Sequence, residues 1–189
     1  LKFMSSGEFS ICGAECFITR SGYTGEDGFE ISMPSMMAEE IAETILSHED
    51  TELIGLGARD SLRLEAGLCL YGQDINEMTT PVEANLGWTI GKRRRKEGGF
   101  PGFENIIRQL KDGVSTRRYG VRPDGRAPAR AGTEIFDLEG NKIGKISSGG
   151  FGPTVGAPIA MAYIDSSSIE TGSKVSVLVR DNLLPATIT

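Results

Sequence analysis

Residues 21–31, Ser-Gly-Tyr-Thr-Gly-Glu-Asp-Gly-Phe-Glu-Ile, combine a tight loop with side chains that can bind a ligand. Three glycines in seven residues let the backbone fold sharply and adopt positive φ at little cost. Apolar and polar residues then alternate, which predicts a strand over 28–33 with Glu30 on its polar face. A carboxylate fixed beside Tyr23 suits a flat ligand with a polar edge. The alternative is a glycine-rich hairpin whose Glu30 is simply solvated.

A second candidate pair is Arg59 and Arg63, which lie four residues apart in a predicted helix over 58–66. Residues at this spacing are neighbours on one helix face. Two guanidinium groups on one face can bind an anionic ligand. They can equally pair with nearby acids such as Asp60 or Glu65, and both interpretations stay open.

Several further elements must position these side chains. Hydrophobic periodicity and turn residues predict strands over 16–20 and 28–33 and helices over 36–47, 58–66 and 103–110. Ser35 is the expected N-cap of the first helix. Residues 86–90 are typical of a buried strand, and the polar stretch 74–80 is typical of a surface loop.

From Val114 onward the pattern becomes all-β. Strands are predicted over 117–122, 159–164 and 174–180, with a hairpin joining 134–138 to 142–146. Residues 149–158 are rich in glycine and predict a flexible loop. Such short, glycine-separated strands favour a small barrel or sandwich. The predicted fold class is therefore α+β, with domains over 1–112 and 113–189.

Length and composition limit the class of protein. The 189 residues can form one large or two small domains. No apolar run approaches the ~20 residues that cross a bilayer, and no secretory leader opens the chain, so we expect no membrane association. The first residue is Leu1, so we expect a processed chain or a fragment. Three cysteines without a C-x₂-C pair predict reduced thiols, and the single His48 argues against a histidine-based metal site.

The charge is distributed unevenly. Residues 1–90 hold four Lys and Arg against 16 Asp and Glu, whereas residues 91–189 hold 16 against ten. Either the two halves meet different partners or they attract each other. Residues 92–96, Lys-Arg-Arg-Arg-Lys, are most simply a solvated basic surface. No aromatic residues suited to base stacking accompany them, so we expect no nucleic-acid partner.

Five blocks of sequence resemble the glycine cleavage aminomethyltransferases, the T-protein family. They occur in the family's order and cover most of residues 16–105. The blocks are Gly-Tyr-Thr-Gly-Glu-Asp-Gly at 22–28, Ala-Arg-Asp-Ser-Leu-Arg-Leu-Glu-Ala-Gly at 58–67, Leu-Tyr-Gly-Gln-Asp at 70–74, Thr-Thr-Pro-Val-Glu-Ala at 79–84 and Gly-Lys-Arg-Arg-Arg at 91–95. Residues 114–180 are similar to the family's C-terminal barrel.

This resemblance implies a function and a set of site residues. The family transfers a methylene group from an aminomethyl-lipoyl carrier, the H-protein, to tetrahydrofolate and releases ammonia. Glu30 matches the family's folate-contacting glutamate, Tyr23 an aromatic of the same cavity, and Arg59 a ligand-contacting arginine. Tetrahydrofolate is the implied co-substrate, and no metal is implied. Arg130 lies in a barrel motif, where we expect a structural or rim role.

The departures from the family limit what the chain can do. Family members are about twice as long, and we expect no counterpart here of their N-terminal half, which holds the aspartate that orients the reacting nitrogen and assists proton transfer. No catalytic residue is therefore assigned, and the isolated chain is expected to be inactive. Alternatives are the folate module of a sarcosine or dimethylglycine oxidising enzyme, or a non-catalytic interaction module. The resemblance places a eukaryotic protein in the mitochondrial matrix and a bacterial one in the cytoplasm.

Overall fold

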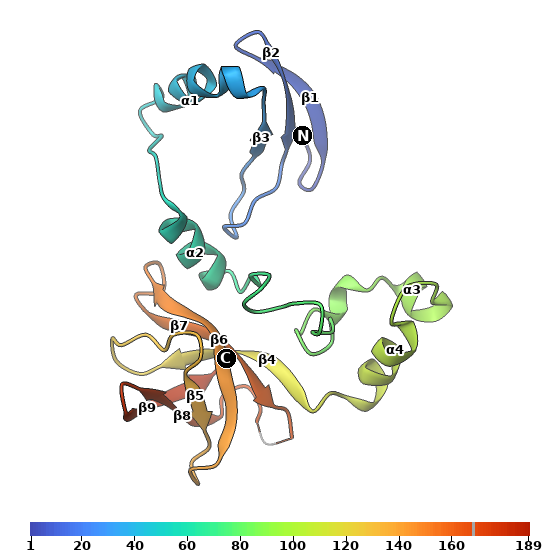
Figure 1. Ribbon diagram of the computed structural model, residues 1–189, viewed down its shortest axis with the longest axis vertical. Coiled ribbons are helices and arrows are strands. Elements are labelled where there is room, and N and C mark those ends of the chain that lie inside the picture. The colour runs from blue at the N-terminus through green and yellow to red at the C-terminus, as the bar shows by residue number, and fades with distance from the viewer. Residues whose placement is uncertain (168) are drawn as a thin grey trace. The chain divides into compact units, whose positions relative to one another are not determined.

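The computed structural model describes residues 1–167 and 169–189 and has a mixed α+β fold (Figure 1). The chain divides into two compact units, Leu1–Ala66 and Gly67–Thr189. The predicted boundary between residues 112 and 113 falls inside the second unit, shortly before the barrel begins. Whether that boundary separates two folding domains stays a prediction.

The first unit contains a three-stranded antiparallel sheet in the order β1 (Ser6–Ile11), β2 (Ala14–Thr19) and β3 (Glu30–Ser32). Three helical segments follow: η1 (Ser35–Met37), α1 (Ala38–Leu46) and α2 (Leu56–Glu65). The predicted strands and helices are thus confirmed. The predicted Ser35 cap is wrong, because Ser35 opens a 3₁₀ turn and no side chain caps η1 or α1.

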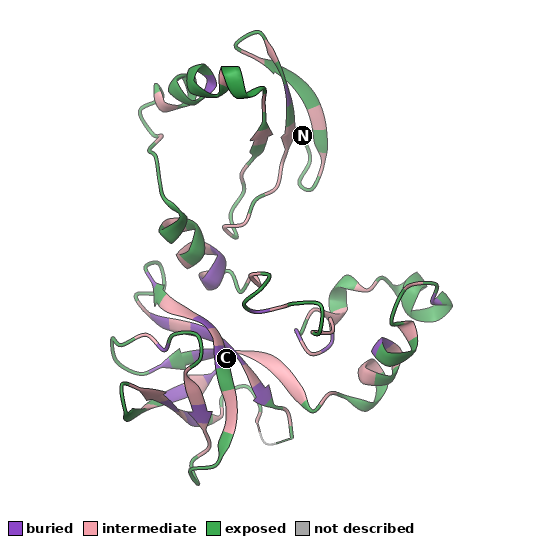
Figure 2. Ribbon diagram, in the orientation of Figure 1, coloured by how far each residue is buried: buried purple, intermediate pink, exposed green. Residues whose placement is uncertain are grey.

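Few side chains of the first unit are buried (Figure 2). Between Leu1 and Ala66, every residue of which is described, the buried side chains are those of Cys16, Ile41, Arg63 and Leu64. Large apolar groups such as those of Phe29 and Leu56 are exposed. The unit therefore has only a small hydrophobic core of its own.

Three helical segments precede the barrel in the second unit: η2 (Gly87–Thr89), α3 (Lys92–Glu97) and α4 (Phe103–Asp112). Helix α4 confirms the prediction over 103–110 and ends before Gly113, whose φ of 86° is left-handed. The strand predicted over 86–90 is wrong. The N–H groups of Thr89 and Ile90 donate back to Leu86 and Gly87, and this tight turn leaves Trp88 77% exposed.

A closed six-stranded antiparallel barrel forms the rest of the second unit (Figure 1). Its hydrogen-bonded order is β4-β7-β6-β5-β8-β9. The strands are β4 (Thr116–Pro123), β5 (Glu134–Phe136), β6 (Lys142–Gly152), β7 (Ala157–Asp165), β8 (Lys174–Val179) and β9 (Asn182–Ile188). The barrel is filled by small and branched side chains, including Val121, Ile135, Ile146, Ile164, Val177 and Ile188.

The flexible loop predicted over 149–158 is largely wrong. Strand β6 continues to Gly152 and β7 starts at Ala157, so only a short turn joins them. The glycines serve close packing here, because a Cβ on Gly149 would lie 1.8 Å from the carbonyl oxygen of Ala129.

Asp74, placed by the sequence in a surface loop, is instead 1% exposed. Its carboxylate accepts hydrogen bonds from the hydroxyls of Ser147 and Ser148 at 2.5 and 2.9 Å and from the Leu70 N–H at 2.8 Å. Its backbone carbonyl accepts from the Tyr163 hydroxyl at 2.7 Å. A buried carboxylate is tolerated when donors satisfy it in this way, and Asp74 thereby fastens its segment to β6 and β7.

Candidate functional site

An arginine closes the glycine-rich loop between β2 and β3. Nε and Nη2 of Arg20 donate to the two carboxylate oxygens of Asp27 at 2.8 and 2.5 Å. This side-chain hydrogen bond lowers the pKa of Asp27 and raises the pKa of Arg20. The pair is solvent-accessible, so it contributes little to global stability and mainly fixes the shape of the loop.

The same loop packs against the C-terminal end of α2. Gly25 has a φ of +79°, and a Cβ at this position would lie 2.4 Å from the Cβ of Ala66. Glycine is therefore required here both by the backbone angle and by the close approach. Sequence reasoning identified the glycines but not the helix end that Gly25 approaches.

Tyr23 and Arg59 are brought together by this packing. The guanidinium carbon of Arg59 lies 5.0 Å from the centroid of the Tyr23 ring, within the range of a cation–π contact. Arg59 is exposed and Tyr23 is half-buried. The guanidinium can therefore rest on the ring and still present N–H donors to a ligand.

Arg63 differs from Arg59, although both lie on α2. Its side chain is 2% exposed, and its Nε donates to a carboxylate oxygen of Asp60 at 2.8 Å. For Arg63, the alternative interpretation of pairing with a nearby acid is the one that the structure supports. Of these two arginines, Arg59 is the one that remains a candidate for ligand binding.

Glu30 begins β3 opposite Thr19 of β2, and it is exposed as expected of the polar face. Its carboxylate accepts a hydrogen bond from the Ser21 hydroxyl at 3.1 Å. Ser21 is in turn 2.9 Å from the hydroxyl oxygen of Thr19. Glu30 thus meets the start of the glycine-rich loop, and an ionised carboxylate with one such bond can accept several more.

The described residues, 1–167 and 169–189, contain no group of three His, Cys, Asp or Glu side chains placed to hold a metal ion. Within the same residues, no helix has both the length and the apolar character that crossing a bilayer requires. Cys12 is an exposed thiol and Cys16 a buried one.

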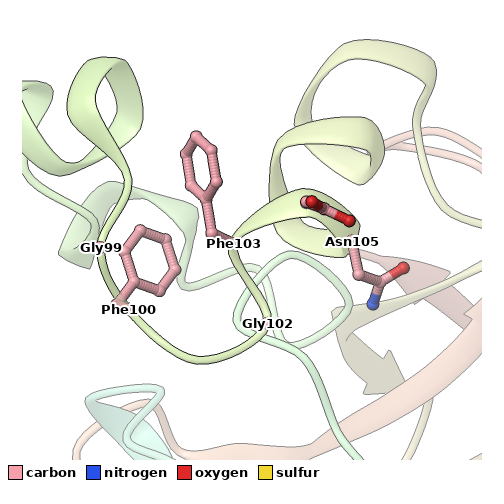
Figure 3. Close-up of a pocket in the computed structure, with 6 residues that line it drawn as sticks. Gly99, Phe100, Gly102, Phe103 and Asn105 are labelled. Carbon is pink, nitrogen blue, oxygen red and sulfur yellow. The ribbon is translucent and has the colours of Figure 1, made fainter.

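Cavities also occur in the second unit. One, of about 520 Å³, opens at the start of α4, where the rings of Phe100 and Phe103 meet edge to face with centroids 5.5 Å apart (Figure 3). Another, of about 320 Å³, is lined in part by Asp74, Glu83 and Tyr163. Burial raises the pKa of Tyr163 to about 12, and the Tyr163 hydroxyl donates to the backbone carbonyl of Asp74.

Comparison with known protein families matches nearly the whole chain. Residues 1–94 match the GCVT N-terminal domain, and residues 117–189 match the glycine cleavage T-protein C-terminal barrel domain. The second match coincides with the closed barrel of strands β4–β9.

Individual relatives agree with these matches. The mitochondrial aminomethyltransferase of Solanum tuberosum is 50% identical over 194 residues, which cover 100% of this chain and 48% of that protein. The Dictyostelium discoideum mitochondrial aminomethyltransferase is 49% identical over 196 residues, with 100% and 48% covered. The crystal structure of glycine cleavage system aminomethyltransferase T from Bartonella henselae has a TM-score of 0.91 at 45% identity and covers 100% of this chain and 51% of that one. The chain thus spans about half the length of the curated relatives it matches.

Proposed function

This chain belongs to the glycine cleavage T-protein (aminomethyltransferase) family, and on that premise we propose that it supplies a folate-binding wall and the C-terminal barrel of an aminomethyltransferase. The full enzyme would move a methylene group from an aminomethyl-lipoyl carrier to tetrahydrofolate. The carbon–sulfur bond to the lipoyl arm and the carbon–nitrogen bond to the amino group break, and the methylene carbon forms two new bonds to two folate nitrogens. The two protons that these nitrogens lose leave on the ammonia and on the reduced lipoyl thiol.

The contact between Tyr23 and Arg59, on the loop that begins beside Glu30, is the observation that carries this proposal. A pterin ring presents an amino group and a ring N–H side by side. The exposed Glu30 carboxylate can accept both in a charge-assisted, two-pronged hydrogen bond. Arg59 offers a planar cation to the carboxylate end of folate, and Tyr23 offers a ring for packing and a hydroxyl for hydrogen bonding.

These three residues bind and orient; none of them is assigned a proton-transfer step. Positioning alone accounts for a large share of barrier reduction in a two-substrate transfer. We therefore propose that the 189-residue chain alone does not turn over, and that activity needs an extended form. By extended form we mean this chain joined to the N-terminal half found in its family.

The proposed protein partner is the lipoyl carrier, or H-protein, and the basic helix α3 supports an electrostatic approach. Arg94 and Arg95 donate to backbone carbonyls, those of Gly98 and Gly99 for Arg94 and of Gly87 and Ile90 for Arg95. Within the described part of the chain, Lys92 and Lys96 form no ion pair and are exposed. We propose that these two lysines steer an acidic carrier.

The proposed location is the mitochondrial matrix, because the Solanum tuberosum and Dictyostelium discoideum relatives are named mitochondrial. A bacterial source would instead place the protein in the cytoplasm. The Bartonella henselae structure shows that the same fold serves a bacterial relative.

An activity assay tests the proposal against its alternatives. The extended form should release ammonia from aminomethyl carrier only when tetrahydrofolate is present, and the 189-residue chain should not. Ammonia-free oxidation of sarcosine or dimethylglycine by a partner enzyme would favour the other one-carbon family. An extended form that binds carrier but neither binds nor uses folate would favour a non-catalytic interaction module.

A further inference from the structure

A cavity of about 600 Å³ at one end of the barrel has no role in the proposed transfer. Two parts of the barrel unit form its walls, namely the loop before β5 and the end of β8 with the turn that follows. Its lining residues are Arg126, Ala127, Pro128, Arg130, Thr133, Leu178, Val179 and Arg180. Three of these eight residues are arginines, and none is acidic.

The loop before β5 is held firmly against the barrel. Ala129 is fully buried, and its carbonyl oxygen approaches Gly149 of β6 so closely that a Cβ there would clash. Nη1 of Arg130 donates to the Gly149 carbonyl at 3.3 Å, and the Thr133 N–H donates to the Arg130 carbonyl at 3.1 Å. The loop therefore presents Arg130 from a fixed backbone.

The opposite wall is equally well defined. Strand β5 pairs with β8 through Ile135 and Val177, and continuing this register places Thr133 opposite Val179. Arg180 and Asp181 then form the two-residue turn into β9, with left-handed φ values of 50° and 64°. This turn directs the chain back along β9 immediately after Arg180.

All the charged residues that line the cavity are positively charged. Among the described residues, none of the three arginines forms an ion pair, and Asp181, although adjacent in sequence, is not part of the lining. Guanidinium groups stay charged at any physiological pH. Three unpaired cations around one hollow repel one another, and an anion with several oxygens relieves that repulsion while accepting forked hydrogen bonds.

We propose that this cavity is a binding site for a small organic or inorganic polyanion, with two or more phosphate or carboxylate charges held by Arg126, Arg130 and Arg180. Pro128, Leu178 and Val179 add an apolar surface, which suits a ligand with a short carbon skeleton. The site lies on the barrel and uses none of Glu30, Tyr23 and Arg59.

Calorimetric titration of the 189-residue chain with pyrophosphate and, separately, with citrate tests this site. Both probes carry several oxyanion charges, and comparing them distinguishes a phosphate source from a carboxylate source. We expect saturable 1:1 binding of at least one probe. Arg126→Gln, Arg130→Gln and Arg180→Gln should each weaken it about tenfold, as expected for losing one charged hydrogen bond.

Arg122→Gln is the matched control. Arg122 is exposed on β4 and pairs with Thr187, toward the end of β9 remote from the Arg180 turn. A second control, Lys92→Gln with Lys96→Gln, reports on anions held at the basic helix. Both controls should keep wild-type affinity, and thermal melts should show every variant folded. No saturable binding of either probe, or equal weakening by the Arg122 control, would overturn the proposal.

Discussion

The guanidinium carbon of Arg59 lies 5.0 Å from the centroid of the Tyr23 ring, so a side chain of helix α2 rests on the aromatic residue of the glycine-rich loop. Tyr23 and Arg59, which are 36 positions apart in two different sequence blocks, meet at this contact. The contact depends on Gly25, whose missing Cβ lets the loop approach Ala66 at the end of the same helix. The loop and the helix therefore form one surface, and it is this surface that we propose faces folate.

Substitutions at Tyr23 should distinguish what the ring contributes to tetrahydrofolate affinity from what the hydroxyl contributes. In the extended form, Tyr23→Leu removes the surface under Arg59 and should lower tetrahydrofolate affinity about five- to tenfold, the scale of a cation–π contact. Tyr23→Phe keeps that surface and should stay within about threefold of wild type. Equilibrium fluorescence titration measures both values. Equal losses in the two variants would mean that the hydroxyl, rather than the ring, is what matters.

Asp74 should be a major stabilising residue of the second unit. Asp74→Ala leaves two serine hydroxyls and the Leu70 N–H without their buried acceptor. The expected loss is about 2–4 kcal/mol in the free energy of unfolding, measured by urea denaturation. The exposed Asp124→Ala is the matched control and should change the free energy by less than about 0.5 kcal/mol. Comparable effects of the two substitutions would contradict the assigned role.

Tyr163 should make the protein sensitive to alkaline pH. Burial favours the neutral phenol and raises its pKa to about 12, whereas an unfolded tyrosine ionises near 10.0. The unfolded state therefore loses its proton first, and stability should fall as the pH rises between these two values. A late step in near-ultraviolet absorbance, near the raised pKa of about 12, should report the ionisation of Tyr163. Tyr163→Phe should remove that late step, and a late step that persists would assign it to another tyrosine.

Reversing the charge of Lys92 and Lys96 on α3 should slow association with the lipoyl carrier. Lys92→Glu with Lys96→Glu should slow association with the lipoyl carrier about tenfold at low salt and flatten its salt dependence. Surface plasmon resonance of the extended form at two ionic strengths measures this. Arg94→Gln is an informative comparison, because it removes a cap on backbone carbonyls and should alter stability more than association. If the lysine variant associates with the carrier at the wild-type rate, α3 is a solvated surface that does not steer the carrier.

Sequence patterns predicted the strands and helices that are determined by residues close together in the chain. Alternation and glycine spacing predicted β3 beside its loop, and helical periodicity with a terminal glycine predicted α4. The hairpin of β5 and β6 followed from its turn residues. The placement of Glu30 on an exposed strand face was also evident, because a period of two is a property of the chain itself.

What the sequence missed was decided by contacts and turns that only the folded chain shows. Asp74 looks like a loop residue until Ser147 and Ser148, more than seventy positions later, bond to it. Trp88 looks buried by type, yet a local turn exposes it. The sequence also left open which of Arg59 and Arg63 pairs with an acid and which is free to bind a ligand. Only the folded helix shows that the Arg63 guanidinium is the one buried against Asp60.

The central claim is that Glu30 binds the pterin of tetrahydrofolate, and calorimetry on the extended form tests it most directly. Glu30→Ala should cost about 1.5–3 kcal/mol of binding free energy, the scale of a charged hydrogen bond. Glu26→Ala removes an exposed carboxylate of the same loop and should leave binding unchanged. If wild type binds folate and Glu30→Ala binds equally well, or if the extended form binds no folate, Glu30 is a solvated strand residue and the account of the site is wrong.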